Sequence, residues 1–183
     1  MRPWARVGQQ RVNGINSRAR PASAGALPGG TPVHIPVDHL REFVVSGFAS
    51  PLDPWTSEAT QQFALARRTA ARMAAEYSDA GFAVVIDDVI WRESAEQHFP
   101  DLRGRPLRKV ALLPALEVAL ARNRTRVGKS LDTCLLEPVI RDLHRRFAQS
   151  CRPEDGWTVL DTSEMTVEAT CAELFRQSLK RLE

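Results

Sequence analysis

Four aspartates in this sequence follow short apolar segments, and their positions suggest that they act together. Asp38 comes after PVHIPV, Asp87 and Asp88 come after FAVVI, and Asp161 comes after WTVL. If each segment is a strand of a parallel sheet, the four carboxylates lie at one edge, where such sheets bind ligands. Carboxylates placed there suit a substrate hydroxyl or a metal ion. Asp is equally typical of turns and helix caps, so both interpretations stay open for each residue.

The strands that would position these aspartates are predicted from their apolar runs. The run at 82–86 is continuous and lacks alternation, which indicates a strand buried on both faces, and 107–113 predicts a further strand. The segments 32–37 and 157–160 predict two more strands, and Pro36 is awkward in a central one. These strands alternate with helical segments, so we expect an α/β fold of three layers, with a mainly parallel sheet between helices.

The longest predicted helix begins with Thr56 or Ser57 as its N-cap and ends at Gly81. A short helix is predicted over 39–45. Pro114 can occupy the first position of another helix, since its missing N–H is not needed there. Apolar residues at helical spacing predict the last two helices, over 133–148 and 166–182.

Residues 1–30 differ from the rest of the chain. Gly and Pro interrupt them too often for a helix, and five arginines precede the first acidic residue, Asp38. Such a segment can contact nucleic acid or an anionic membrane, but no reading module accompanies it, and a net charge of +3 is mild. We therefore expect an irregular segment over 1–30, an α/β domain over 31–183, and no nucleic-acid partner.

Cysteine content and hydropathy bear on the compartment. The chain has 3 cysteines, an odd number and widely spaced, so no disulfide framework or paired metal motif is indicated. No apolar run approaches the roughly 18 residues that a membrane span needs. The arginines near the N-terminus precede no apolar signal core. We expect a cytoplasmic protein with buried thiols and no membrane partner.

The order of these segments resembles that of P-loop small-molecule kinases related to shikimate kinase, gluconate kinase and chloramphenicol phosphotransferase. The segments that carry the resemblance are VHIPVDHLR, GFAVVIDD, LLPALEVALARNRTR, LEPVIRDLHRRF and WTVLDTSEMTVEAT. Together they span about residues 31–179. The chain looks similar to bacterial proteins usually described only as ATP-binding or AAA-family ATPases of this kinase type. The resemblance implies a small-molecule substrate, with ATP and Mg²⁺ as cofactors.

The resemblance also implies roles for particular residues. Asp38 would approach the substrate hydroxyl as acceptor or general base, and Arg41 would hold a substrate anion, although a solvated surface charge is an equal alternative for Arg41. Asp87 or Asp88 would act on Mg²⁺. The phosphates and the nucleotide would be contacted from a lid over about 122–134 and from the loop after the last strand, through Arg122, Arg126, Asp161 and Thr162.

One required motif of such a kinase is missing. A P-loop has the sequence G-x-x-x-x-G-K-[ST] between a strand and a helix. Gly128-Lys129-Ser130 does not meet it, because Asn123 stands where the first glycine is needed. The segment after Asn13-Gly14 begins like the family's loop but lacks the second glycine and the lysine. Residues 5–12 are also polar for a central strand.

We therefore predict a kinase-type protein whose N-terminal strand and P-loop are degraded by a frameshift, a wrong start or decay. Phosphoryl transfer would be impaired or absent, because the lysine that bridges the phosphates is missing. The alternative is a non-catalytic pseudokinase that binds a nucleotide or a partner through the surviving sheet edge.

Overall fold

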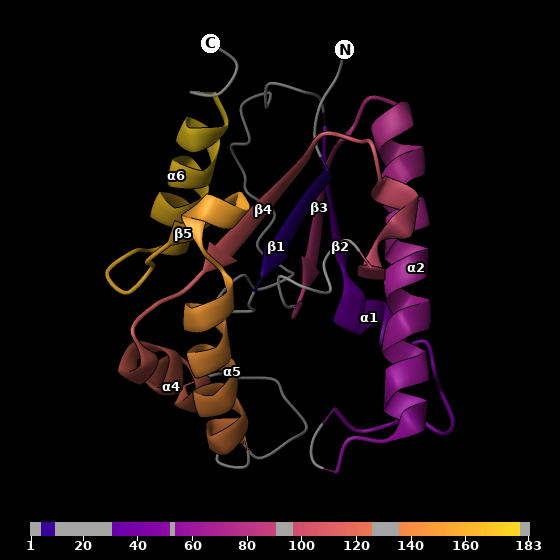
Figure 1. Cartoon of the computed structure of the whole chain (residues 1–183), viewed down its shortest axis with the longest axis horizontal. Helices are drawn as coiled ribbons and strands as arrows, with labels where there is room; N and C mark the ends of the chain where they lie inside the picture. Colours follow the sequence, from indigo (N-terminus) through magenta and orange to yellow (C-terminus); the bar gives the residue numbers. More distant parts are fainter. Residues whose placement is uncertain (1–4, 10–30, 52–53, 91–96, 126–135, 180–183) are drawn as a thin grey trace.

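The computed structural model describes residues 5–9, 31–51, 54–90, 97–125 and 136–179 (Figure 1). Its centre is a five-stranded sheet in which every neighbouring pair is parallel. The prediction of a mainly parallel sheet in an α/β fold is confirmed. The strands, in the spatial order β2-β3-β1-β4-β5, are β1 (Ala5–Gln9), β2 (Pro32–Pro36), β3 (Ala83–Asp88), β4 (Leu107–Leu112) and β5 (Trp157–Leu160).

The central strand β1 corrects a sequence-based expectation. Residues 1–30 were expected to be irregular, yet Ala5–Gln9 pairs with β3 on one side and with β4 on the other. Hydrogen bonds to two neighbouring strands come from the backbone, so context overrides the weak strand propensity of these residues. Without β1, the inner edges of β3 and β4 would be left unpaired. The expectation is wrong for 5–9, and residues 10–30 lie outside the described residues.

The strand predicted around Pro36 is an edge strand. β2 pairs only with β3 in the sheet order, with Pro36 opposite Asp87. Proline cannot donate a ladder hydrogen bond, so the edge is the position in a sheet that tolerates it. The sequence signal at Pro36 thus agrees with the place of β2 in the sheet.

The helices agree with the predicted ones to within a few residues. The short first helix begins two residues earlier than expected, and the helix after Pro114 begins at Leu116 with Ala115 as its N-cap. Figure 1 shows α2 along the β2–β3 side of the sheet and α4, α5 and α6 toward the β4–β5 side. The helices are α1 (Val37–Arg41), α2 (Ser57–Asp79), α4 (Leu116–Arg124), α5 (Glu137–Ser150) and α6 (Val167–Leu179), with 3₁₀ turns η1 (Pro100–Leu102) and η3 (Pro153–Asp155).

The ends of α2 are set by local sequence. The Thr56 hydroxyl accepts a hydrogen bond from the Ala59 N–H at 3.1 Å, which satisfies one of the free donors of the first turn. Ala80 closes the helix, and Gly81 follows with a φ of 88°, a value that glycine adopts without steric cost. Both predicted ends of this helix are confirmed.

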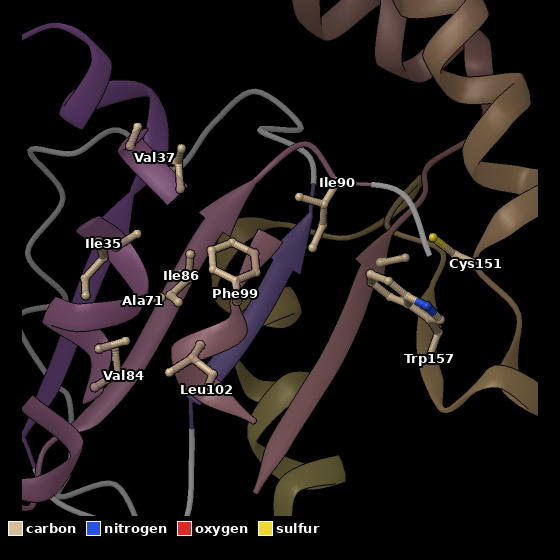
Figure 2. Packing of buried hydrophobic residues seen from close by; sticks show 14 of the residues in the cluster. Ile35, Val37, Ala71, Val84, Ile86, Ile90, Phe99, Leu102, Cys151 and Trp157 are labelled. Carbon is tan, nitrogen blue, oxygen red and sulfur yellow. The ribbon is translucent and has the colours of Figure 1, made fainter. Parts of the chain in front are cut away.

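The core lies where α2 covers β2 and β3, and it continues toward β5 (Figure 2). Small residues on one stripe of α2 are fully buried and let the helix approach the sheet closely. Phe99 and Leu102 pack beside Ile86 in the same cluster, and Trp157 lies near Cys151 at its far end. Cys151 is buried and Cys171 is half-buried, whereas Cys134 lies outside the described residues.

Within the described residues, no helix combines the length and the apolar character that crossing a membrane requires.

Candidate functional site

Three of the four predicted aspartates share one part of the carboxyl edge. Asp38 lies two residues beyond Pro36, which pairs with Asp87, and Asp88 pairs with the last residue of β1, Gln9. Asp87 and Asp88 are the last residues of β3 itself, so they belong to the strand rather than to the loop after it. Side chains alternate along a strand, so these two neighbours face opposite sides of the sheet.

Asp161 lies at the same edge but on the other side of β1. It follows β5, which is three strands from β3 in the sheet order. With strands about 4.8 Å apart, three steps separate these strand ends by roughly 14 Å. The predicted residues therefore divide into two groups, one on each side of the central strand.

Asp88 is the most buried carboxylate at the edge, and Arg67 of α2 pairs with it. Arg67 Nε donates to Asp88 Oδ2 at 2.6 Å, and Nη2 approaches Oδ1 at 3.4 Å. The Val89 N–H donates to Oδ1 at 2.7 Å. The two side chains are 11% and 1% exposed. Burial raises the pKa of the Asp88 carboxyl, while Arg67 and the Val89 N–H act in the opposite direction by favouring the ionised form.

Arg67 has partners on every side of its guanidinium. Besides Asp88, its Nη2 donates to the Val89 carbonyl at 3.0 Å, and its Nη1 lies 3.2 Å from His98 Nε2. Because a guanidinium only donates, Nε2 accepts and the ring proton of His98 is on Nδ1. Burial, with the Arg67 charge as a smaller cause, lowers the pKa of His98 to about 4. His98 is therefore neutral at neutral pH.

Arg41, the last residue of α1, is enclosed by aromatic rings. Its Cζ lies 3.7 Å from the ring centroid of Phe63 and 4.7 Å from that of Phe48. Its Nη2 donates to the Ala49 carbonyl at 2.6 Å, and Trp55 stacks on Phe63. The residue is 3% exposed, and its Nε has no hydrogen-bond partner among the residues that the structure describes. Burial lowers the pKa of the Arg41 guanidinium, and the neighbouring Asp38 partly offsets this.

Asp38, Arg41, Arg67 and Asp88 together form what we call the buried charge cluster. The Asp38 carboxylate raises the pKa of both Arg41 and Asp88. The charges of Arg67 and Asp88 also act on the pKa of Arg41. The cluster thus combines two carboxylates with two guanidinium groups at the ends of β2 and β3. This arrangement places the predicted base, Asp38, beside the predicted anion contact, Arg41.

On the opposite face of the sheet, Asp87 lies near His34. His34 Nε2 is 3.6 Å from Asp87 Oδ2, and the two side chains are 44% and 21% exposed. Both side chains are accessible to water, so this pair is weaker than the buried one. A metal role for Asp87 stays a prediction.

The second group lies between α4 and the loop after β5. Arg122 Nη2 donates to three backbone carbonyls of that loop, those of Thr162 at 2.7 Å, Ser163 at 3.2 Å and Met165 at 3.4 Å. Ser163 in turn donates to Asp161 through its N–H at 2.9 Å and through its hydroxyl, which lowers the pKa of Asp161. The resemblance implies that Arg122, Asp161 and Thr162 contact the nucleotide. The structure brings these three residues together, but their polar atoms make hydrogen bonds that fix the loop after β5. Arg126 and most of the predicted lid lie outside the described residues.

Three of the residues predicted to hold Mg²⁺ or ATP, Asp88, Arg122 and Thr162, do not suit those groups in this arrangement. Mg²⁺ keeps several waters around it, and an Asp88 side chain that is 1% exposed leaves no room for a hydrated ion. Both Asp88 oxygens already accept strong hydrogen bonds. Arg122 directs its donors to carbonyl oxygens, and Thr162 is 3% exposed. The Nη2 group of Arg122 is thus already used by the loop, and the Thr162 side chain is covered.

Sequence reasoning missed Arg67 and His98, which complete the cluster. A signal for Arg67 was present, because it lies one helical turn after Phe63 and one turn before Ala70 and Ala71, on the stripe that packs on the sheet. A charged residue on a buried stripe needs a buried partner, and Asp88 is that partner. His98 follows residues 91–96, which lie outside the described residues, and carried no periodic signal.

Comparisons with known proteins agree with this fold. The tunicamycin resistance protein of Deinococcus radiodurans is similar in structure, with a TM-score of 0.51 and 18% sequence identity, over 84% of this chain and 82% of that one. At this identity the likeness shows the fold alone, which is P-loop-kinase-like. No protein-family model and no curated protein matches the sequence.

Proposed function

We propose that the protein descends from P-loop small-molecule kinases and binds a small hydroxylated molecule at the carboxyl edge of its sheet, with phosphoryl transfer impaired or lost. The P-loop-kinase-like fold supports the ancestry. As part of the proposal, the helices form a layer on each face of the sheet, with the ligand at the edge between them.

The observation that carries the loss of transfer is in the sequence between β1 and β2. Counting from Gly14, the second glycine of a P-loop would fall on Ala19, the lysine on Arg20 and the hydroxyl residue on Pro21. Alanine in place of glycine restricts the backbone that wraps the phosphates, and proline lacks both an N–H and a hydroxyl. Without these groups the chain has no phosphate cradle of the kinase type.

The binding half of the proposal is supported by Asp38 and Arg41. They lie one turn apart on α1, and the charge of Asp38 acts on the pKa of Arg41. An aspartate can accept a hydrogen bond from a ligand hydroxyl, and an arginine can hold an anionic group beside it. Ligand access to Arg41 would need the segment with Phe48 and Ala49, which now covers the guanidinium, to move aside.

The loss of transfer is tested by rebuilding the loop. The triple variant Ala19→Gly, Arg20→Lys, Pro21→Ser reads G-I-N-S-R-G-K-S and satisfies the P-loop pattern. Its matched control carries Arg20→Ala in place of Arg20→Lys. Titration calorimetry with ATP and Mg²⁺ should show micromolar binding for the triple variant, and none for the control or the chain as written. Micromolar binding by the chain as written would show that ATP is bound without the P-loop pattern, and this half of the proposal would be wrong.

The binding half needs a different experiment. A panel of hydroxylated carboxylates and phosphate esters can be screened for a rise in the melting temperature of the full chain. We expect hits that lose their effect in Asp38→Asn and keep it in Glu42→Gln, because Glu42 is an exposed acid just after α1. Hits that respond equally in both variants would place the ligand elsewhere on the molecule.

A further inference from the structure

The ion pair between Arg67 and Asp88 occupies the place where a kinase of this fold would keep an acid for its metal ion. Three features of the pair affect whether a metal ion could bind there. Both oxygens of Asp88 accept hydrogen bonds, the guanidinium of Arg67 is held by several partners, and the surrounding charges balance. Each is independent of the proposed function, because each concerns the protein without a ligand.

The first feature is the saturation of Asp88. Arg67 Nε takes Oδ2 at 2.6 Å and the Val89 N–H takes Oδ1 at 2.7 Å. These short contacts are typical of charge-assisted hydrogen bonds, about twice as strong as neutral ones. A metal ion could bind this carboxylate only after one of them had been broken within a buried environment.

The second feature is the rigidity of Arg67. It extends from the middle of a 23-residue helix, and its other donors meet the Val89 carbonyl and His98 Nε2. Its Cζ also lies 5.1 Å from the ring centroid of Phe63. Withdrawing the guanidinium from Asp88 would strand several partners at once, each of which would need a new one.

The third feature is the charge balance. The two carboxylates of the buried charge cluster, Asp38 and Asp88, are matched by the two guanidinium groups of Arg41 and Arg67. A divalent cation would add two positive charges beside the buried Arg41 and the largely covered Arg67. Removing charges from water is costly unless they are paired, so the balanced cluster opposes such a cation.

We propose that the Arg67 guanidinium takes the place of a divalent cation at the end of β3, so that the Asp88 side of the sheet edge binds no metal ion. A ligand that binds beside this cluster then does so without Mg²⁺. The protein would then differ from a kinase that has lost only its phosphate loop, because the Arg67 side chain also occupies the position of the metal ion.

Binding of Mn²⁺ to the full-length protein tests this, with the free ion followed by electron paramagnetic resonance. All variants carry Asp87→Asn, which removes the other strand-end carboxylate. We expect this background protein to leave the Mn²⁺ signal unchanged, whereas adding Arg67→Met should create a site that binds at least tenfold more tightly. Adding Asp88→Asn to the Arg67→Met protein should abolish that site. Arg67→Gln, which keeps a donor but no charge, replaces Arg67→Met if that variant does not fold.

Two results would overturn the proposal. One is Mn²⁺ binding by the background protein that disappears on Asp88→Asn, since Asp88 would then hold a metal despite Arg67. The other is the absence of any gain on removal of the Arg67 charge, since Arg67 would then not be what excludes the metal. Neither readout involves a nucleotide or a rebuilt loop, so a failure here is separate from a failure of the proposed function.

Discussion

The two sides of the central strand use arginine differently. On the β2–β3 side, Arg67 pairs with a carboxylate that is 1% exposed and balances its charge. On the β4–β5 side, Arg122 donates to the carbonyls of Thr162, Ser163 and Met165 and joins a loop to a helix. The difference lies in what each arginine leaves behind when removed. Loss of Arg67 strands a buried charge, whereas loss of Arg122 strands neutral oxygens beside water.

The largest effect is expected for Arg67→Met. Removing one partner of a buried ion pair typically costs about 3–5 kcal/mol, because the remaining charge stays buried and unpaired. The matched control is Arg68→Met, whose side chain lies on the exposed face of the same helix. Urea unfolding of both variants gives the comparison. If Arg67→Met lowered the free energy of unfolding no more than Arg68→Met, the pair would contribute nothing and the contrast between the two sides would be lost.

A smaller effect is expected for Arg122→Met. Its carbonyl contacts form ordinary hydrogen bonds, which contribute about 1 kcal/mol each, and water can replace part of them at this half-buried position. We expect a loss of about 1–2 kcal/mol and faster amide exchange in the 161–166 loop, with no change around Asp88. Arg124→Met is the control, because Arg124 pairs with Glu137 on the surface. Equal exchange in both variants would show that Arg122 does not hold the loop.

The parts of the fold and of the candidate site also differ in how far the sequence predicts them. The strand ends, the caps of α2 and the common edge of Asp38, Asp87 and Asp88 follow from apolar runs and local signals. Strand β1 could not be predicted, because its polar residues gain their strand conformation from two neighbours far away in the sequence. Arg67 gives a signal as a charge on the buried stripe of α2, but its pairing with Asp88, 21 residues away, depends on how α2 packs on the sheet.

The role of Arg122 shows the same limit. In the structure Arg122 lies against Thr162. The sequence and the resemblance assign Arg122 to the phosphates and the loop after β5 to the nucleotide, and this assignment stays a prediction. They do not reveal that its donors turn toward backbone carbonyls, because carbonyls of a loop leave no mark in the sequence. Residue type and position were therefore predictable at this edge, whereas the choice of hydrogen-bond partner was not.

A third experiment uses pH to examine the β2–β3 side. The folded pKa of His98 is about 4, below its usual value of 6.5, so the unfolded chain binds the proton more readily. Stability is then unaffected above the unfolded pKa and falls as the pH drops from there toward 4. His98→Gln keeps an acceptor for Arg67 but cannot be protonated. The charged groups that face position 98 are Arg67 and, behind Arg67, Asp88.

The measured quantity is the difference in unfolding free energy between the unchanged chain and His98→Gln. As the pH falls from neutral to about 5, we expect the unchanged chain to lose stability relative to His98→Gln. Because His98 is partly accessible to solvent, the expected loss is only about 1 kcal/mol. His144→Gln serves as the control, because its ring contacts the Pro114 carbonyl, away from the cluster. A difference that stays constant with pH would show that folding does not lower the pKa of His98, against the acceptor role assigned to it.

The smallest effect is expected where the geometry of the buried pair is repeated on the surface. Arg105 donates to both oxygens of Asp79, at 2.7 Å and 2.8 Å, a two-point contact like that of Arg67 with Asp88, whose distances are 2.6 Å and 3.4 Å. Asp79 is 64% exposed, however, so water and salt screen the pair and solvate either partner when the other is removed. Arg105→Gln should therefore shift the melting temperature by no more than the scatter between repeated measurements. High salt should abolish any shift. A loss comparable to that of Arg67→Met would mean that contact geometry, and not burial, sets the cost on the β2–β3 side.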